Sequence, residues 1–221
     1  MTRPHRVLLV DDDPLARSGL RLLLRSAANI EVVAEATDGA EVITAVQAHY
    51  PDVILMDLGM PRMDGIDATA AVRGLPNPPH VIALTTWDVS DAVVRCIEAG
   101  AAGYLLKSDH PDAIVKAVED VIAGDAVLSP RSTRQLLDRF RDEPGGDARA
   151  KARDLVATLS AREVEVARGV GRGLSNATVA GELYVSEATV KTHLSAVQAK
   201  LGARNRVDVA VLAERAGLLA G

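Results

Sequence analysis

Short apolar runs alternate with longer amphipathic stretches from residue 6 to about residue 123. A short apolar run between turn residues is typical of a buried strand, whereas apolar residues three or four positions apart are typical of a helix. The pattern predicts strands at 6–11, 30–36, 52–57, 80–85 and 103–106, and helices near 14–26, 39–48, 64–73, 89–99 and 110–123. Such strand–helix units predict an α/β fold, a doubly wound five-stranded parallel sheet with helices on both faces.

The pattern changes after Gly124 and is helical throughout from Leu159. Residues 131–141 are predicted to form one short helix. The stretch 143–154 is charged and poor in large apolar residues, which is typical of a linker. We therefore predict three parts: a domain at 1–125, a linker with a short helix at 126–154, and a small all-α domain at 155–221.

The all-α domain contains the pattern of a helix-turn-helix. Ser160 and Glu163 form a capping box that opens its first helix. Tyr184-Val185-Ser186 separates a short second helix from a third at 187–201, which is apolar on one side and polar on the other. Two helices joined by such a tight turn predict a DNA-binding helix-turn-helix. A final helix begins at Asn205.

Composition bounds the function. The chain has 221 residues, enough for two modest domains that each bury a core. It has no apolar run long enough for a membrane span and no signal-peptide pattern, so we expect a soluble, cytoplasmic protein with no membrane partner. Its one cysteine, Cys96, excludes an internal disulfide and a thiolate metal cluster.

Charge is distributed unevenly along the chain. Residues 1–130 hold 10 Lys and Arg against 19 Asp and Glu, a net charge of −9, whereas residues 148–221 hold 11 against 7, a net charge of +4. An acidic first domain suits metal or phosphate chemistry, and a basic last domain suits nucleic acid.

Chemistry-bearing residues stand at the ends of the predicted strands. The apolar run 53–56 ends on Asp57, the first strand ends on Asp11 and Asp12, and Thr85 and Lys107 end two others. Because ligands bind at the carboxyl ends of parallel strands, these side chains are expected to converge. Carboxylates with a backbone carbonyl suit Mg²⁺, Asp57 can act as nucleophile toward a phosphoryl group, and Lys107 can pair with its oxygens. Thr85 can donate a hydroxyl hydrogen bond.

Three further aspartates precede predicted helices and have a simpler interpretation. Asp13 stands before Pro14, Asp38 before Gly39, and Asp64 before Gly65. Aspartate is a preferred N-cap residue, so we expect Asp13 to cap a helix and Asp38 to precede a helix start. Asp64 is expected to be a loop or helix-start residue.

Several motifs resemble those of a known family. Val10-Asp11-Asp12, Asp57-x-x-Met60-Pro61-x-Met63-Asp64-Gly65, Leu84-Thr85-Thr86 and Gly103-Tyr104-Leu105-Leu106-Lys107 resemble the receiver domain of two-component response regulators, which has a flavodoxin-like fold. Leu159-Ser160-x-Arg162-Glu163 and Val185-Ser186-Glu187-x-Thr189-Val190-Lys191-Thr192-His193 resemble the LuxR-type helix-turn-helix of the NarL/FixJ subfamily. Together the two resemblances cover nearly the whole chain except the linker.

The resemblance implies a phosphorylation-controlled transcription factor and not a metabolic enzyme, although a receiver can slowly dephosphorylate itself. A sensor histidine kinase would phosphorylate Asp57, which would promote dimerisation and sequence-specific binding to double-stranded DNA. Asp12, Asp57 and the carbonyl of Gly59 would hold Mg²⁺, with Asp11 in its water shell. Thr85 and Tyr104 would form the switch pair.

This chain departs from the family pattern at three places. Ser108 follows the lysine where many receivers have proline, as is common in this subfamily. The second helix of the all-α domain reads Asn176-Ala177-Thr178-Val179-Ala180, where relatives often read Asn-Lys-Glu-Ile-Ala. Ser195 replaces a residue that is often basic in relatives that read DNA. The missing charges reduce the expected number of phosphate contacts.

The helix at 187–201 supplies most of the candidate DNA contacts. Lys191 and Thr192 are the best candidates, and the other candidates are His193, Ser195, Lys200, Arg204 and Asn205. In the final helix, Val209, Leu212 and Ala216 are expected to face inward, which leaves Val207 and Val211 to meet a second copy in a homodimer. The alternative is that both faces pack within one domain.

Two other functions use part of the same pattern. A phosphatase of the haloacid dehalogenase type also has a strand-end aspartate nucleophile, but it needs a second aspartate two positions later, where this chain has Gly59. A receiver-like protein that binds DNA regardless of phosphate is the second alternative. The intact acidic set argues against it, and a phosphorylation assay decides.

Overall fold

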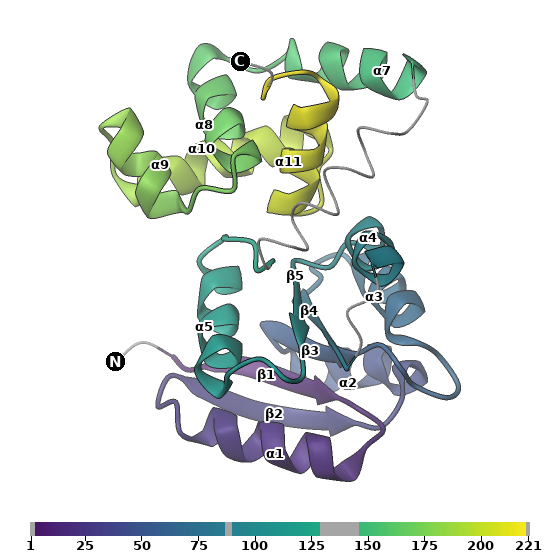
Figure 1. Ribbon diagram of the computed structural model, residues 1–221. Coiled ribbons are helices and arrows are strands. Elements are labelled where there is room, and N and C mark those ends of the chain that lie inside the picture. The colour runs from purple at the N-terminus through teal and green to yellow at the C-terminus, as the bar shows by residue number, and fades with distance from the viewer. Residues whose placement is uncertain (1–2, 87–89, 129–145, 220–221) are drawn as a thin grey trace. The chain divides into compact units, whose positions relative to one another are not determined.

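The computed structural model describes residues 3–86, 90–128 and 146–219 (Figure 1). Its only sheet among these residues has five parallel strands in the order β2-β1-β3-β4-β5. The strands are β1 His5–Val10, β2 Ile30–Ala36, β3 Val53–Asp57, β4 His80–Thr85 and β5 Gly103–Leu106. This is the flavodoxin-like order, which confirms the predicted fold class.

Helices cover both faces of the sheet, as predicted. The first unit contains α1 Pro14–Arg25, the 3₁₀ turn η1 Gly39–Glu41, α2 Val42–His49, α3 Gly65–Arg73, α4 Ser90–Ala99 and α5 Pro111–Ile122. Figure 1 shows α1 and α5 on one side of the strands and α2 and α3 on the other. The sequence predicted one continuous helix at 39–48, but the residues Gly39–Glu41 form a 3₁₀ turn, and Asp38 caps it by accepting the amide N–H of Ala40.

Alternate strand residues enter two separate cores. Val7 and Leu9 pack in the core with side chains of α1 and α5, whereas Leu8 and Val10 pack in the core with α2 and α3. All four side chains are buried. A strand that is covered on both faces needs apolar residues at successive positions, which explains the continuous apolar runs.

The predicted cap at Asp13 is present, and Asp64, at the start of α3, is a cap as well. Asp13 Oδ1 accepts the amide N–H of Leu15 at 2.8 Å, and Asp64 Oδ1 accepts those of Ile66 and Asp67 at 2.9 and 2.8 Å. Each helix therefore begins immediately after a strand-end loop, which fixes the direction in which those loops leave the sheet.

The second unit is all-helical. Its helices are α7 Gly146–Val156, α8 Ala161–Gly171, α9 Asn176–Leu183, α10 Glu187–Leu201 and α11 Arg206–Arg215. The capping box of Ser160 and Glu163 is present at the start of α8. Buried side chains of α8, α9, α10 and α11 form one core, which includes the predicted α10 stripe of Val190, Leu194, Val197 and Leu201.

Helix α7 corrects the sequence-based view of the linker. Residues 146–154 were predicted to be linker without a helix, but they form most of α7, which contacts α10 and α11. Its helix-forming side chains surround a narrow apolar stripe in which Ala152 and Val156 are buried. The helix predicted at 131–141 lies outside the described residues. The chain forms two compact units that part near residue 124, and the predicted domain bounds stay predictions.

Within the described part of the chain, no helix combines the length and the apolar character that a membrane crossing requires.

Candidate functional site

The carboxyl ends of the strands bring the predicted residues together. β1 and β3 are neighbours in the sheet, and the residues that follow or end them are Asp11, Asp12 and Asp57. A cavity of about 520 Å³ lies at this edge. Its walls include Asp12, Asp57, Gly59, Thr85 and Lys107, so one cavity contains most of the predicted site.

The ammonium of Lys107 joins two buried carboxylates. Its Nζ lies 2.8 Å from Oδ2 of Asp11 and 3.0 Å from Oδ1 of Asp57. Asp11 is 1 % exposed and Asp57 is 6 % exposed, whereas Asp12 is exposed. A buried carboxylate needs an opposite charge nearby, and Lys107 supplies it to both.

Burial and ion pairing act in opposite directions on the pKa values of Lys107 and Asp11. Burial alone would lower the pKa of Lys107, but the interactions of its ammonium with Asp11 and Asp57 raise it, so the side chain stays charged at neutral pH. Burial raises the pKa of Asp11 by more than Lys107 lowers it. The pKa of the Asp11 carboxyl therefore lies above its ordinary value, and burial is the main cause.

The donor set fits a metal ion. One carboxylate oxygen from each of Asp11, Asp12 and Asp57 can be chosen so that all three lie within 4.8 Å of one another. Oδ2 of Asp11 is buried and lies 2.8 Å from the ammonium of Lys107. Divalent cations such as Mg²⁺ prefer hard oxygen ligands, and these three carboxylates offer one oxygen each. Gly59 lines the same cavity.

The predicted switch residues lie on neighbouring strands. Thr85 ends β4 and lines the cavity, and its partner in register on β5 is Leu106. Tyr104, two residues earlier on β5, is paired with Ala83. Both Thr85 and Tyr104 are buried, and their role in switching stays a prediction.

Sequence reasoning missed three charged side chains in the cavity wall. Asp13 was interpreted only as a cap and Asp64 only as a loop or helix-start residue. Both cap helices, and both also line the cavity. Arg95 of α4 lines it as well and adds a second cation to the wall. No motif contains Arg95, and a single arginine on an amphipathic helix gives no signal before the helix is placed.

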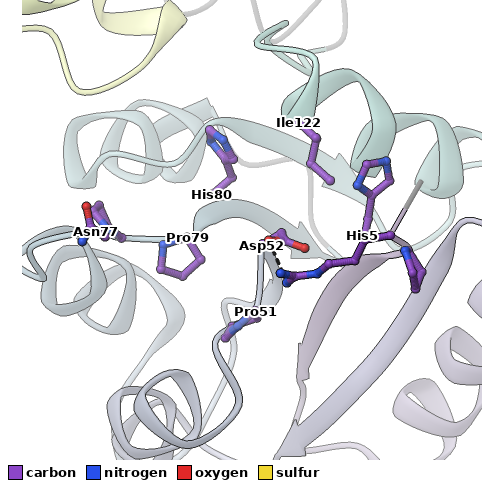
Figure 2. A pocket seen from close by; sticks show the side chains of 10 residues that line it. His5, Pro51, Asp52, Asn77, Pro79, His80 and Ile122 are labelled. Atoms are coloured by element: carbon purple, nitrogen blue, oxygen red, sulfur yellow. Dashed lines mark ion pairs between the residues drawn. The ribbon is translucent and has the colours of Figure 1, made fainter. Parts of the chain in front are cut away.

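A second cavity, of about 490 Å³, lies at the opposite ends of the strands (Figure 2). Its polar side chains include His5, His80 and Asp52, and Asp52 forms an ion pair with Arg3 at 3.6 Å. Asp52 also accepts the amide N–H of Arg6 at 2.8 Å. These bonds join the starts of β1 and β3, so we interpret the carboxylate as structural.

The exposed face of α10 presents some of the predicted DNA contacts. Lys191, Thr192 and Ser195 are exposed, and His193 is half-buried. The hydroxyls of Thr192 and Ser195 donate to backbone carbonyls one turn earlier, each at 3.0 Å, which leaves their oxygens free to accept. Lys191 is therefore the strongest cationic candidate on this face.

Three other DNA candidates have structural partners. Lys200 Nζ lies 2.7 Å from Oε2 of Glu163, Asn205 is buried and caps α11 by accepting the amide N–H of Asp208, and Arg204 pairs with Asp208 at 2.7 Å. The sequence pattern placed these residues on or next to the recognition helix but did not show their partners. The DNA contacts of all these candidates, including Lys191, stay predictions.

The predicted dimer face differs from expectation. Val209, Leu212 and Ala216 contribute to the core of the second unit, as predicted, and Val207 and Val211 do not. However, Val207 is only 2 % exposed and Val211 only 6 %, so they do not form the open face that was expected. Dimerisation through them stays a prediction, and it requires this face to become accessible.

Glu163 gives the second unit a pH-dependent bond. Hydrogen bonds from Lys200 and from the amide of Ser160 hold the pKa of Glu163 at about 2. Because this pKa lies below the ordinary value of 4.5, the stabilisation is complete above about pH 4.5 and is lost as the pH falls towards 2. We expect amide hydrogen exchange in α8 to accelerate over that window, and Glu163→Gln to remove this contribution. Glu165→Gln, two positions away, should retain it, and equal profiles for the two variants would contradict the assignment.

Comparisons with known proteins agree with this geometry. Residues 7–119 match the family model for the response regulator receiver domain, and residues 157–213 match that for bacterial regulatory proteins of the luxR family. The transcriptional regulatory protein LnrK of Bacillus subtilis (strain 168) is 36 % identical over 96 % of this chain and 98 % of its own length. The nitrate/nitrite response regulator protein NarP of Escherichia coli (strain K12) is 39 % identical over 95 % of this chain and 94 % of its own.

A solved structure extends the likeness to the whole chain. The crystal structure of response regulator ChrA, from a heme-sensing two-component system, is 37 % identical, covers 98 % of this chain and 100 % of that chain, and gives a TM-score of 0.53. The family is one of transcription factors and not of metabolic enzymes, so the phosphatase alternative is wrong. The chain therefore belongs to the two-component response regulators of the NarL/FixJ subfamily, transcriptional regulators in which a receiver domain is joined to a LuxR-type DNA-binding domain.

Proposed function

We propose that Asp57 accepts a phosphoryl group from a sensor histidine kinase in a Mg²⁺-dependent reaction, and that the phosphorylated cytoplasmic protein dimerises and binds specific sites on double-stranded DNA. The observation that carries this proposal is the position of the Lys107 ammonium, 2.8 Å from Asp11 and 3.0 Å from Asp57, within a group of three carboxylates.

The residues of the cavity have distinct tasks in the transfer. A carboxylate oxygen of Asp57 attacks the phosphorus, and the bond from phosphorus to the donor atom breaks with its electron pair leaving on the donor. Lys107 holds Asp57 in place and can then pair with the new phosphoryl oxygens. Thr85 can donate its hydroxyl to the same group. Asp12, Asp57 and the Gly59 carbonyl would hold Mg²⁺, with Asp11 in its water shell, and the cation would neutralise charge during the transfer.

The basic second unit is proposed to act as the DNA-binding module. One short recognition helix makes few base contacts, whereas two linked modules raise affinity by roughly 10² to 10⁴ through effective concentration. Thr85 and Tyr104 would report phosphorylation, and the face of Val207 and Val211 would then become available to a second copy.

Sedimentation combined with DNA footprinting tests the whole proposal. Full-length protein with Mg²⁺ and beryllofluoride, which mimics the phosphoryl group, should sediment as a dimer and protect two half-sites on DNA selected from a random pool. Without beryllofluoride it should be monomeric and bind the same DNA more weakly. Equal binding in the two states would favour the alternative in which DNA binding ignores phosphate.

A substitution in α10 separates DNA reading from phosphorylation in the same experiment. Lys191→Ala should take up beryllofluoride normally but lose about 1 to 3 kcal/mol of binding if Lys191 reads a base, with relaxed preference at one position. If Lys191 contacts only phosphate, the loss should be equal on all sequences and the salt dependence should fall by about one ion. Wild-type affinity and preference would remove Lys191 from the interface.

A further inference from the structure

Asp38 is a buried carboxylate that lies outside the acidic cluster. It is 1 % exposed, and it precedes η1 after the end of β2. Its Oδ1 accepts the amide N–H of Ala40 at 2.9 Å, which is the predicted cap. The cap occupies only one of the two carboxylate oxygens. A further role of Asp38 would depend on what the other oxygen, Oδ2, binds.

The second oxygen of Asp38 binds a loop that is distant in sequence. Oδ2 accepts the amide N–H of Arg62 at 2.9 Å, and the amide of Met63 also contributes. Burial alone would raise the pKa of Asp38, but these N–H groups and the charge of Arg62 lower it. The carboxylate is therefore ionised at neutral pH and bonds more strongly than a neutral acceptor.

The same loop forms one wall of the phosphoacceptor cavity. It runs from Leu58 to Asp64 and carries Gly59. The amide N–H of Leu58 donates to the carbonyl of Leu84 at 3.2 Å, and that of Gly65 donates to the carbonyl of Leu58 at 3.2 Å. These bonds fix the two ends of the loop. Asp38 fixes its middle.

Close packing at Gly39 shows how near the two segments lie. A Cβ atom on Gly39 would stand 2.5 Å from the carbonyl oxygen of Met63, which is closer than atoms can approach. The chain must therefore lack a side chain at position 39 for Asp38 to reach the loop. The guanidinium of Arg62 pairs with Glu41 at 2.6 Å and lies 3.5 Å from Oδ1 of Asp38. Its side chain is 62 % exposed, so water screens these ion pairs and the loop depends mainly on the backbone amides that Asp38 accepts.

We propose that Asp38 is a positioning residue for the metal site, which holds the loop from Leu58 to Asp64 so that the backbone carbonyl of Gly59 faces the cation. This role rests on the proposed phosphoacceptor function of the cavity. Groups that orient a metal ligand without touching the metal typically change metal affinity by roughly 10- to 100-fold when they are removed.

Mg²⁺ titration of the full-length protein by calorimetry tests this role. Asp38→Asn keeps an oxygen for the Ala40 cap but presents an amide to the N–H of Arg62, so Mg²⁺ affinity should fall about tenfold or more. Asp38→Ser keeps a capping side chain that is too short to reach the loop, and it should show the same loss. It also serves as the test if Asp38→Asn does not fold.

Three controls separate positioning from other effects. Glu41→Gln removes the same charge nearby, and Arg62→Ala removes the side chain but retains the amide that Asp38 binds. Val118→Ala destabilises the opposite core, in which Val118 is buried. All three should bind Mg²⁺ within about twofold of wild type, because none removes the acceptor of the loop amide.

The outcomes are distinct. Wild-type Mg²⁺ affinity in both Asp38 variants would overturn the role. An equal loss in Val118→Ala would also overturn it, because general destabilisation would then explain the result. A wild-type protein that binds no Mg²⁺ would refute the proposed metal site itself, and the positioning role with it.

Discussion

Replacing Asp57 by asparagine is expected to abolish phosphoryl uptake completely. In the wild-type protein, intact-mass measurement after incubation with acetyl phosphate and Mg²⁺ should show one added phosphoryl group. The amide introduced by Asp57→Asn cannot form the acyl phosphate, because it lacks a charged nucleophilic oxygen. Asp11, the other carboxylate that pairs with Lys107, does not line the cavity and cannot replace it. Asp57→Asn and Asp57→Ala should both remain at the unmodified mass.

Asp67→Asn is the matched control for this result. Asp67 lies in the first turn of α3, is exposed and does not line the cavity, so its variant should gain phosphate like the wild type. Phosphate on Asp57→Asn to the wild-type extent would refute the assignment of the phosphoacceptor. A modified wild type together with an unmodified Asp67→Asn would instead point to Asp67.

Replacing Gly65 by alanine is expected to destabilise the receiver more than any other single methyl addition discussed for it. A Cβ at Gly65 would stand 2.0 Å from the carbonyl oxygen of Asp57. The position of the Cβ is fixed by the backbone of Gly65, and the oxygen belongs to the backbone of Asp57. Neither atom can rotate away, so α3 must move away from β3. Overpacking of a core typically reduces the free energy of unfolding by about 1 to 3 kcal/mol, and we expect about 3 kcal/mol or more here, measured by urea denaturation.

Gly19→Ala, in the same domain, is expected to raise the free energy of unfolding. Gly19 lies inside α1, and a Cβ there would meet no atom within 4 Å. Alanine is a better helix former than glycine, so this variant should be more stable than wild type by up to about 1 kcal/mol. If Gly65→Ala proved as stable as Gly19→Ala, the close contact between α3 and β3 would be wrong.

The sequence predicted the sheet and the cavity for the same physical reason. Strands that are buried on both faces must be apolar at successive positions, so polar residues such as Asp57 and Lys107 mark the points where strands leave the core. The carboxyl ends of parallel strands lie at the same edge of a sheet. Locating the end of each strand in the sequence was therefore enough to predict that these side chains converge.

Features that depend on contacts between distant residues were not predictable in this way. α7 was taken for linker because its apolar stripe is narrow and most of its residues are charged or small. Lys200 and Asn205 were assigned to DNA because local sequence shows their polarity but not their partners, Glu163 and Asp208. The second oxygen of Asp38 was missed for the same reason, since its partner is 24 residues away.

The recognition helix α10 contains two kinds of residue, and the ion pair between Lys200 and Glu163 helps to tell them apart. Its buried stripe and Lys200 attach α10 to the rest of the domain, whereas Lys191, Thr192 and Ser195 are exposed and bind no residue outside their own helix among the contacts described. Substitutions at the exposed positions can therefore change which DNA sequence is preferred without weakening the fold. During evolution, a duplicated gene for such a protein could acquire new target promoters through a few changes in α10, while its scaffold and its phosphoacceptor cavity stayed the same.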